Sequence, residues 1–192
     1  MEEAKVQLTA FIDKLRIRST KYKDQSQFLR YLFYKVHQKY LSHYRPQSSF
    51  TDLLATKEYD CLTGTALYAM ILDALDVDHK IVETEFHIFL LVQGKESEIL
   101  FETTDPLSGF IRDARQVKET ITRFSQPTAQ NEEAYYQFSF NIYNHIDLRQ
   151  LAGLHYYNQA VSFYNQQKME LALINLEPSS YTPIPGCKNL KG

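Results

Sequence analysis

Three short stretches of the sequence decide the fold: YDCLTGTALY at residues 59–68, EFHIFLLV at residues 85–92 and FETTDP at residues 101–106. The first stretch opens a helix near Cys61, because apolar residues follow it at helical spacing. The second stretch is apolar on both faces, which indicates a central β-strand. The third is extended and ends in a turn at Asp-Pro. A turn at residues 93–97 joins the two strands and predicts an antiparallel hairpin.

Helices are expected before this hairpin as well. Apolar residues at helical spacing predict helices over residues 6–17 and 28–40, and Asp24 or Ser26 is the candidate N-cap of the second helix. The helix that begins near Cys61 is expected to pack on the sheet through one apolar face. The residues expected on that face are Leu67, Met70 and Ile71.

Extended runs fill the middle of the chain, and helices return at its end. Residues 79–92 and 98–104 are the extended runs of the hairpin, and a third extended run is predicted at residues 136–142. Apolar spacing predicts two short helices at residues 151–164 and 169–176. They resemble a tetratricopeptide-type helical hairpin, expected to pack on the core by Leu151, Leu154 and Leu171.

The order of these elements predicts an α+β fold. We expect a helical layer, an antiparallel sheet of three or more strands and a C-terminal helical hairpin. The predicted division of the chain is a core at residues 1–142, the helical hairpin at residues 143–180 and an irregular tail at residues 181–192.

Composition excludes several classes of protein. The chain has 192 residues, of which 44% are hydrophobic, enough for a real core. Lys and Arg number 21 against 23 Asp and Glu, a net charge of −2, which argues against a nucleic-acid partner. No apolar run approaches the roughly 18 to 20 residues of a membrane span. The first residues, MEEAK, do not resemble a secretory leader, so the sequence as written predicts a soluble chain; a leader ahead of it would make the protein periplasmic or secreted.

The cysteines and histidines predict neither a disulfide framework nor a metal site. Cys61 and Cys187 are the two cysteines, and Cys187 falls in a proline-rich tail. His37 and His43 are six residues apart, whereas a helix needs a spacing of three or four for shared ligation. No acidic loop has the composition of a calcium site. We therefore expect no metal and no cofactor.

Cys61 is the candidate nucleophile. It lies where a helix begins, and the partial positive charge of a helix N-terminus favours a thiolate. Small residues follow it, so that a substrate can approach this end of the helix. Asp60 opposes the effect by its own charge, or caps the helix instead.

The hairpin supplies a candidate base and a carboxylate to orient it. Depending on the register, His87 faces Thr103 or Thr104. In the first register Asp105 is the next residue on the face of His87, within reach of the imidazole. Glu102 is the alternative carboxylate and points to the face opposite Asp105. A nucleophile, a base and an orienting carboxylate make up a catalytic triad.

The order of Cys61 at a helix start, His87 on one strand and Asp105 after the next resembles the transglutaminase-like branch of the papain-like cysteine protease superfamily. The Asp-Cys start, the aromatic residue two positions after His87 and the Asp-Pro turn carry this resemblance, which covers about residues 25–112. It implies a core in which the helix bearing Cys61 packs on an antiparallel sheet. It also implies Cys61 as nucleophile, His87 as general base and acid, and Asp105 as the orienting carboxylate.

The predicted function is thiol-dependent acyl transfer on an amide or peptide bond, by hydrolysis or by transamidation, with a peptide or protein as substrate. The backbone N–H of Cys61 would be one oxyanion donor. Tyr44, Gln47 and Ser49 stay open as the second. The alternative is a catalytically silent module that binds a peptide or protein on the same fold. The sequence predicts no oligomeric state.

Overall fold

The computed structural model describes residues 2–84, 87–125 and 143–179. None of the helices in these ranges is long and apolar enough to cross a membrane. The elements follow one another in the order α1 (Glu2–Ser19), α2 (Gln25–Tyr40), β1 (His43–Tyr44), α3 (Phe50–Thr56), β2 (Glu58–Tyr59), α4 (Cys61–Ala74), β3 (His79–Thr84), β4 (Ile88–Gln93), β5 (Glu98–Phe101), β6 (Phe110–Ile111), α5 (Ala114–Phe124), β7 (Tyr143–Ile146), α7 (Leu148–Asn165) and α8 (Met169–Ser179).

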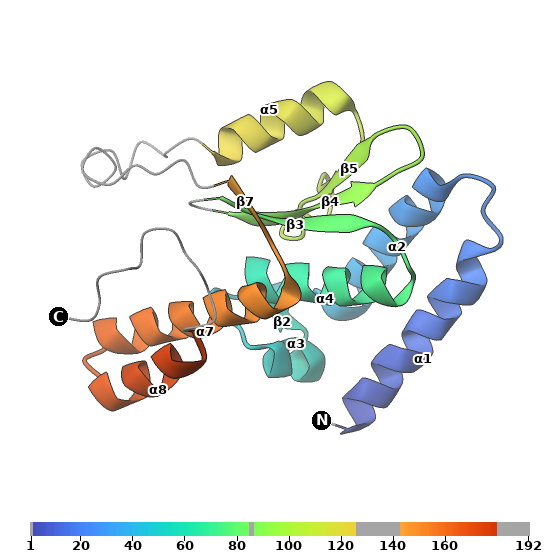
Figure 1. Cartoon of the computed structure of the whole chain (residues 1–192). Coiled ribbons are helices and arrows are strands. Elements are labelled where there is room, and N and C mark those ends of the chain that lie inside the picture. The colour runs from blue at the N-terminus through green and yellow to red at the C-terminus, as the bar shows by residue number, and fades with distance from the viewer. Residues whose placement is uncertain (1, 85–86, 126–142, 180–192) are drawn as a thin grey trace.

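The fold is α+β and is built on a five-stranded antiparallel sheet. Its strand order is β6-β5-β4-β3-β7, so β4 lies in the centre. Five of the six residues of β4 are buried, as its apolar sequence predicts. Helix α5 covers one face of the sheet, and α4 with α2 covers the other (Figure 1). Helices α1 and α2 are the two helices predicted before the hairpin, and each is a few residues longer than expected.

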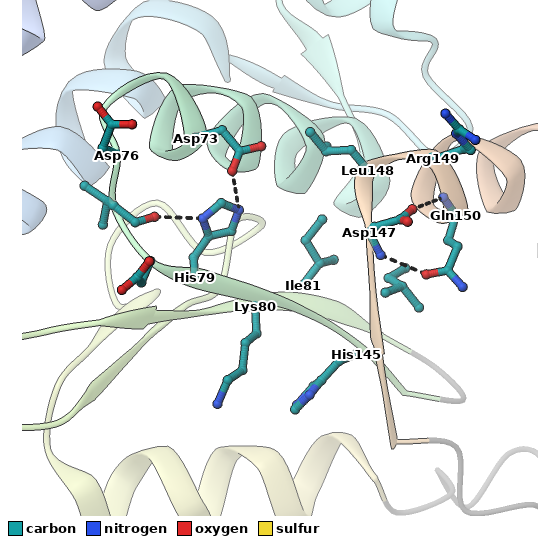
Figure 2. Close-up of a pocket in the computed structure, with 13 residues that line it drawn as sticks. Asp73, Asp76, His79, Lys80, Ile81, His145, Asp147, Leu148, Arg149 and Gln150 are labelled. Carbon is teal, nitrogen blue, oxygen red and sulfur yellow. Dashed lines mark hydrogen bonds and ion pairs between the residues drawn. The ribbon is translucent and has the colours of Figure 1, made fainter.

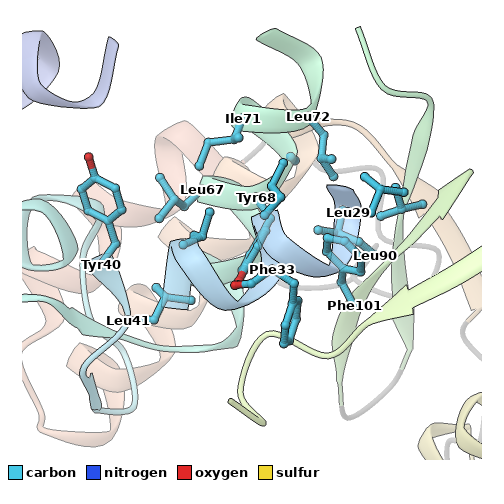
Figure 3. Packing of buried hydrophobic residues seen from close by; sticks show 14 of the residues in the cluster. Leu29, Phe33, Tyr40, Leu41, Leu67, Tyr68, Ile71, Leu72, Leu90 and Phe101 are labelled. Carbon is cyan, nitrogen blue, oxygen red and sulfur yellow. The ribbon is translucent and has the colours of Figure 1, made fainter. Parts of the chain in front are cut away.

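Aromatic rings fill the core between α2, α4 and the sheet. Phe33 of α2 packs with Tyr68 of α4 at a centroid distance of 5.5 Å and with Phe101 of β5 at 5.1 Å (Figure 3). The Tyr68 hydroxyl donates to the backbone carbonyl of Phe33, which satisfies the one polar atom of that ring. Full burial of a side chain of this size stabilises a fold by roughly 1.5–3 kcal/mol.

Helix α4 is the buried centre of the molecule. Asp60 caps it by accepting from the Thr63 backbone N–H at 2.8 Å, and the Thr63 hydroxyl accepts from the Asp60 N–H at 2.9 Å. Leu67 and Ile71 are buried as predicted. Met70 is not: it is 38% exposed, because it lies on the side of α4 turned toward α3 and α7.

The sheet contains three strands that were not expected. Residues 79–84 and 88–93 form two antiparallel strands, β3 and β4, instead of one extended run, and the short strand β6 pairs with β5. Strand β7 pairs with β3, although it lies in the range assigned to the helical hairpin. The strand predicted at residues 136–142 lies outside the described residues.

The two C-terminal helices form the expected hairpin, and only α7 rests on the core. Leu151 is 2% exposed and Leu154 packs beside it in the cluster that contains α4. Leu171 of α8 is 42% exposed, so the prediction that it packs on the core is wrong. The reason is the order of the layers, since α7 lies between α8 and α4 (Figure 1).

Candidate functional site

Cys61 is the first residue of α4, directly after the cap Asp60. Its side chain is partly buried and packs against the main core. The helix can approach the sheet closely here because Gly64 has no side chain. A methyl group at Gly64 would lie 3.1 Å from the Thr103 hydroxyl. The hydroxyls of Thr65 and Thr103 are 3.3 Å apart, so the first turn of α4 rests on the end of β5.

The thiol of Cys61 is held in its protonated form. Burial, and then the charges of Asp60 and Glu102, raise its pKa from 9.0 to about 12, while the N–H groups of Leu62 and Cys61 lower it. The expectation of a thiolate favoured by the helix N-terminus therefore fails for the protein without substrate. Loss of hydration and two nearby carboxylates outweigh the helix terminus.

His87 is paired with Glu102. Its backbone closes the turn between β3 and β4, since the Thr84 N–H donates to the His87 carbonyl at 2.8 Å. Its Nε2 donates to Oε2 of Glu102, whose side chain is 9% exposed. The other oxygen of Glu102 accepts from the N–H of Thr104 at 2.8 Å and from its hydroxyl. The ring of His87 also rests on Phe124 at a centroid distance of 4.3 Å.

Asp105 has a different role from the one predicted. Its Oδ1 accepts from the N–H groups of Leu107 at 3.0 Å and Ser108 at 2.8 Å, so it shapes the turn before β6. The cause is the register of the hairpin. Leu90 pairs with Phe101, and continuing that register places His87 opposite Thr104. A shift of one residue exchanges the faces of a strand, and it brings Glu102 instead of Asp105 to the face of His87.

Glu102 links the two halves of the site. It hydrogen-bonds His87, and its charge acts on the Cys61 thiol. Among the described residues no hydrogen bond joins the Cys61 sulfur to His87, and Nδ1 of His87 makes none. Glu102 therefore connects Cys61 and His87 electrostatically, while the His87 ring rests on Phe124 of α5, the helix that covers the face of the sheet opposite α4.

Of the three candidate oxyanion donors, the structure brings Tyr44 to this end of α4. Burial raises the pKa of the Tyr44 hydroxyl, and the charges of Cys61, Asp60 and Glu102 raise it further. The Ser49 hydroxyl is occupied, because it donates to the Asp52 carboxylate at 2.7 Å in the cap of α3. Gln47 is exposed, at a backbone φ of 63°.

His37 also lies in this region, although the sequence drew attention to it only as one of two histidines too far apart to share a metal. It is 6% exposed on α2, with its ring 6.3 Å from that of Tyr59. Burial lowers the pKa of His37 to about 4, and the charges of Asp105 and Glu102 partly oppose this. Its position on the apolar face of α2 gave no sign that it faces carboxylates from another element.

A large cavity lies at the far end of α4. Its volume is about 960 Å³, and it is bounded by the end of α4, by β3 and β7 and by the start of α7 (Figure 2). Two of its polar side chains bond within the lining: Nδ1 of His79 donates to the Val77 carbonyl at 3.0 Å, and Asp147 caps α7 by accepting from the Gln150 N–H at 2.7 Å. Asp73 is twelve residues from Cys61, about 18 Å along a helix, so this cavity is separate from the cysteine site.

Comparisons with known proteins found no match to this chain among protein-family models, curated proteins or solved structures. Cys187, the second cysteine, lies outside the described residues.

Proposed function

We propose that this protein is a thiol-dependent acyl-transfer enzyme that acts on an amide or peptide bond, with Cys61 as nucleophile and His87 as general base and acid. The observation that carries the proposal is the position of Glu102, which hydrogen-bonds His87 and whose charge acts on the thiol of Cys61 at the start of α4. A carboxylate that binds one ring nitrogen fixes the tautomer and leaves the other nitrogen to act as a base. Glu102 takes the positioning role predicted for Asp105.

In the proposed chemistry the Cys61 thiol is the proton donor and Nδ1 of His87 is the proton acceptor. Nδ1 of His87 accepts the thiol proton as the sulfur attacks the carbonyl carbon, and the carbonyl oxygen becomes an oxyanion. The imidazolium then gives that proton to the leaving amine, and a thioester remains on Cys61. Water adds to the thioester with His87 as base, and the carboxylic acid leaves as the thiol forms again. A second amine in place of water gives transamidation.

The high pKa of the thiol makes the base necessary. With a pKa of about 12, almost no thiolate exists at neutral pH without a proton acceptor. The negative charge that develops on the carbonyl oxygen needs donors as well. The backbone N–H at the start of α4 and the hydroxyl of Tyr44 are the groups proposed for this task.

A small activated ester tests the proposal without knowledge of the natural substrate. We expect p-nitrophenyl acetate at pH 7.5 to acetylate Cys61, as detected by peptide mapping, and His87→Gln to slow this by a factor of about 100, within the range for general base catalysis. Glu102→Gln should slow it about tenfold and change its pH profile, because the tautomer is no longer fixed. Asp105→Asn is the control, since asparagine also accepts hydrogen bonds in a turn.

The catalytically silent binding module is the second candidate. The raised thiol pKa, and the lack of a bond between the Cys61 sulfur and His87 among the described residues, favour it. The same experiment decides. If Cys61 stays unmodified, or is acetylated at a rate that His87→Gln does not change, the enzyme proposal is wrong and the binding module stands.

A further inference from the structure

An uncharged cleft runs along α4 from the end that carries Cys61. It has a volume of about 570 Å³, within the range of ligand sites, and lies between α3, α4 and α7. Leu62 and Leu151 form a buried floor, 4% and 2% exposed, and Met70 and Tyr156 form an open rim, 38% and 41% exposed. The helices that enclose it lie together on the same side of the sheet (Figure 1).

The chemistry of the walls selects against charged groups. Among the thirteen lining residues there is no aspartate, glutamate, lysine or arginine. His155 also lines the cleft. Its pKa is lowered by burial, although Asp60 and Asp52 oppose this, and the Gln159 side chain lies 2.9 Å from its Nε2. The ring is therefore neutral at neutral pH. A charged group placed here would lose its hydration without gaining a partner, whereas an apolar group would not.

The cleft begins where the proposed reaction takes place. Leu62 and Thr63 line it, and they are the two residues that follow Cys61. Leu62, Ala66 and Met70 are spaced by four and form one stripe along α4, about 12 Å long. A chain whose carbonyl lies at the Cys61 sulfur can reach this stripe with a side chain one or two residues away, because an extended chain advances about 3.3 Å per residue.

We propose that this cleft binds a large apolar side chain of the acyl donor, of the size of leucine, methionine or phenylalanine. In naming a substrate, this inference rests on the proposed function, but the binding itself does not require turnover. The occupant is chosen by charge: uncharged walls, a neutral histidine and a buried leucine floor suit an apolar side chain.

Binding is tested with the full chain carrying Cys61→Ala, so that no chemistry intervenes. The ligands are four capped pentapeptides, Gly-Gly-Xaa-Gly-Gly, with Phe, Leu, Lys or Asp at Xaa, and the readout is the methyl NMR signals of Leu62, Ala66 and Met70. We expect the Phe and Leu peptides to shift these signals and to bind at least about tenfold more tightly than the Lys and Asp peptides.

A charge placed on the rim gives the matched comparison. Met70→Glu changes an exposed side chain, so the fold is retained, and it should weaken the Phe peptide about tenfold and favour the Lys peptide. Leu173→Glu is the control, since Leu173 is 67% exposed on α8 and does not line the cleft. Equal binding of the four peptides overturns the proposal. Equal effects of Met70→Glu and Leu173→Glu on binding also overturn it. So does a dependence of the cleft NMR signals on protein concentration, because it would show that a second copy of the chain occupies the cleft.

The two proposals fail separately. An acetyl group has no side chain to place in the cleft, so acetylation of Cys61 by p-nitrophenyl acetate does not depend on it. Acetylation without peptide selectivity disproves the cleft alone. Selective binding without acetylation disproves the enzyme alone.

Discussion

Buried His37 predicts an acid-sensitive fold. Its ring packs 4.8 Å from that of Phe33 and 5.9 Å from that of Tyr68. Neither ring nitrogen has a hydrogen-bond partner among the described residues. Burial therefore disfavours the charged ring and lowers the pKa of His37 from 6.5 to about 4, against the opposing charges of Asp105 and Glu102.

This shift fixes the size and sign of the effect on stability. The folded pKa lies below the unfolded one, so the unfolded chain takes up the proton first as the pH falls. The contribution of His37 is complete above pH 6.5 and is lost as the pH falls to about 4. A difference of roughly 2.5 pKa units corresponds to about 3 kcal/mol of unfolding free energy.

The assay is urea unfolding at several pH values between 7 and 4. We expect His37→Phe to remove about 3 kcal/mol of the loss in unfolding free energy between pH 7 and pH 4. At pH 7 it should raise the unfolding free energy by roughly 1–3 kcal/mol, because two buried nitrogens without hydrogen-bond partners disappear. Tyr40→Phe is the control. It removes an unpaired buried hydroxyl from the same helix, and that group does not titrate in this pH range. Parallel losses of stability in the wild type and His37→Phe would refute the reasoning.

Two further predictions concern the start of α4 and the turn before β6. Asp60→Asn keeps an N-cap residue but removes a charge that raises the pKa of Cys61. Iodoacetamide should therefore alkylate Cys61 faster at pH 8, with little change in the free energy of unfolding. An unchanged rate would contradict the role of the Asp60 charge in raising that pKa. Gly109→Ala places a methyl group against the backbone carbonyls of Glu102 and Asp105 and should cost roughly 1–3 kcal/mol in urea unfolding. In Gly64→Ala the added methyl group lies 3.1 Å from the Thr103 side chain, and the loss of unfolding free energy should be smaller than in Gly109→Ala. Equal losses in the two variants would show that contact with backbone atoms is not what makes Gly109→Ala destabilising.

The strongest local signals in the sequence identified the centre of the fold. The apolar run of β4 predicts a central strand, and the sequence of α4 has both an N-cap residue and an apolar face. Helix α5 was missed, although Val117, Ile121 and Phe124 recur at helical spacing and form the face that packs on the sheet. The division of residues 79–92 into two strands was also invisible, since strand-forming residues lie on both sides of the turn.

The orienting carboxylate could not be chosen from the sequence for a physical reason. Two registers of the β4–β5 hairpin satisfy the apolar pattern, because both strands are buried on both faces. The local turn sets the register, because the Gly94 N–H donates to the Ser97 carbonyl at 3.0 Å and Leu90 then pairs with Phe101. One residue of difference exchanges Asp105 for Glu102. The types of residue in the site were therefore predictable, and the partner of the histidine was not.

Glu102 sets the energetic balance of the proposed mechanism. Its charge disfavours a thiolate on Cys61, and its carboxylate accepts a hydrogen bond from Nε2 of His87. Transfer of the thiol proton to His87 creates both charges together, so the carboxylate opposes one and stabilises the other. The bonded charge is the nearer of the two, and the attraction falls with distance. Glu102→Gln should therefore slow acylation even though it lowers the thiol pKa, whereas Asp60→Asn removes only the opposing charge. Removing the Glu102 charge should thus slow acylation, and removing the Asp60 charge should speed it. This difference separates Glu102, which positions the base His87, from Asp60, which only lies near the thiol.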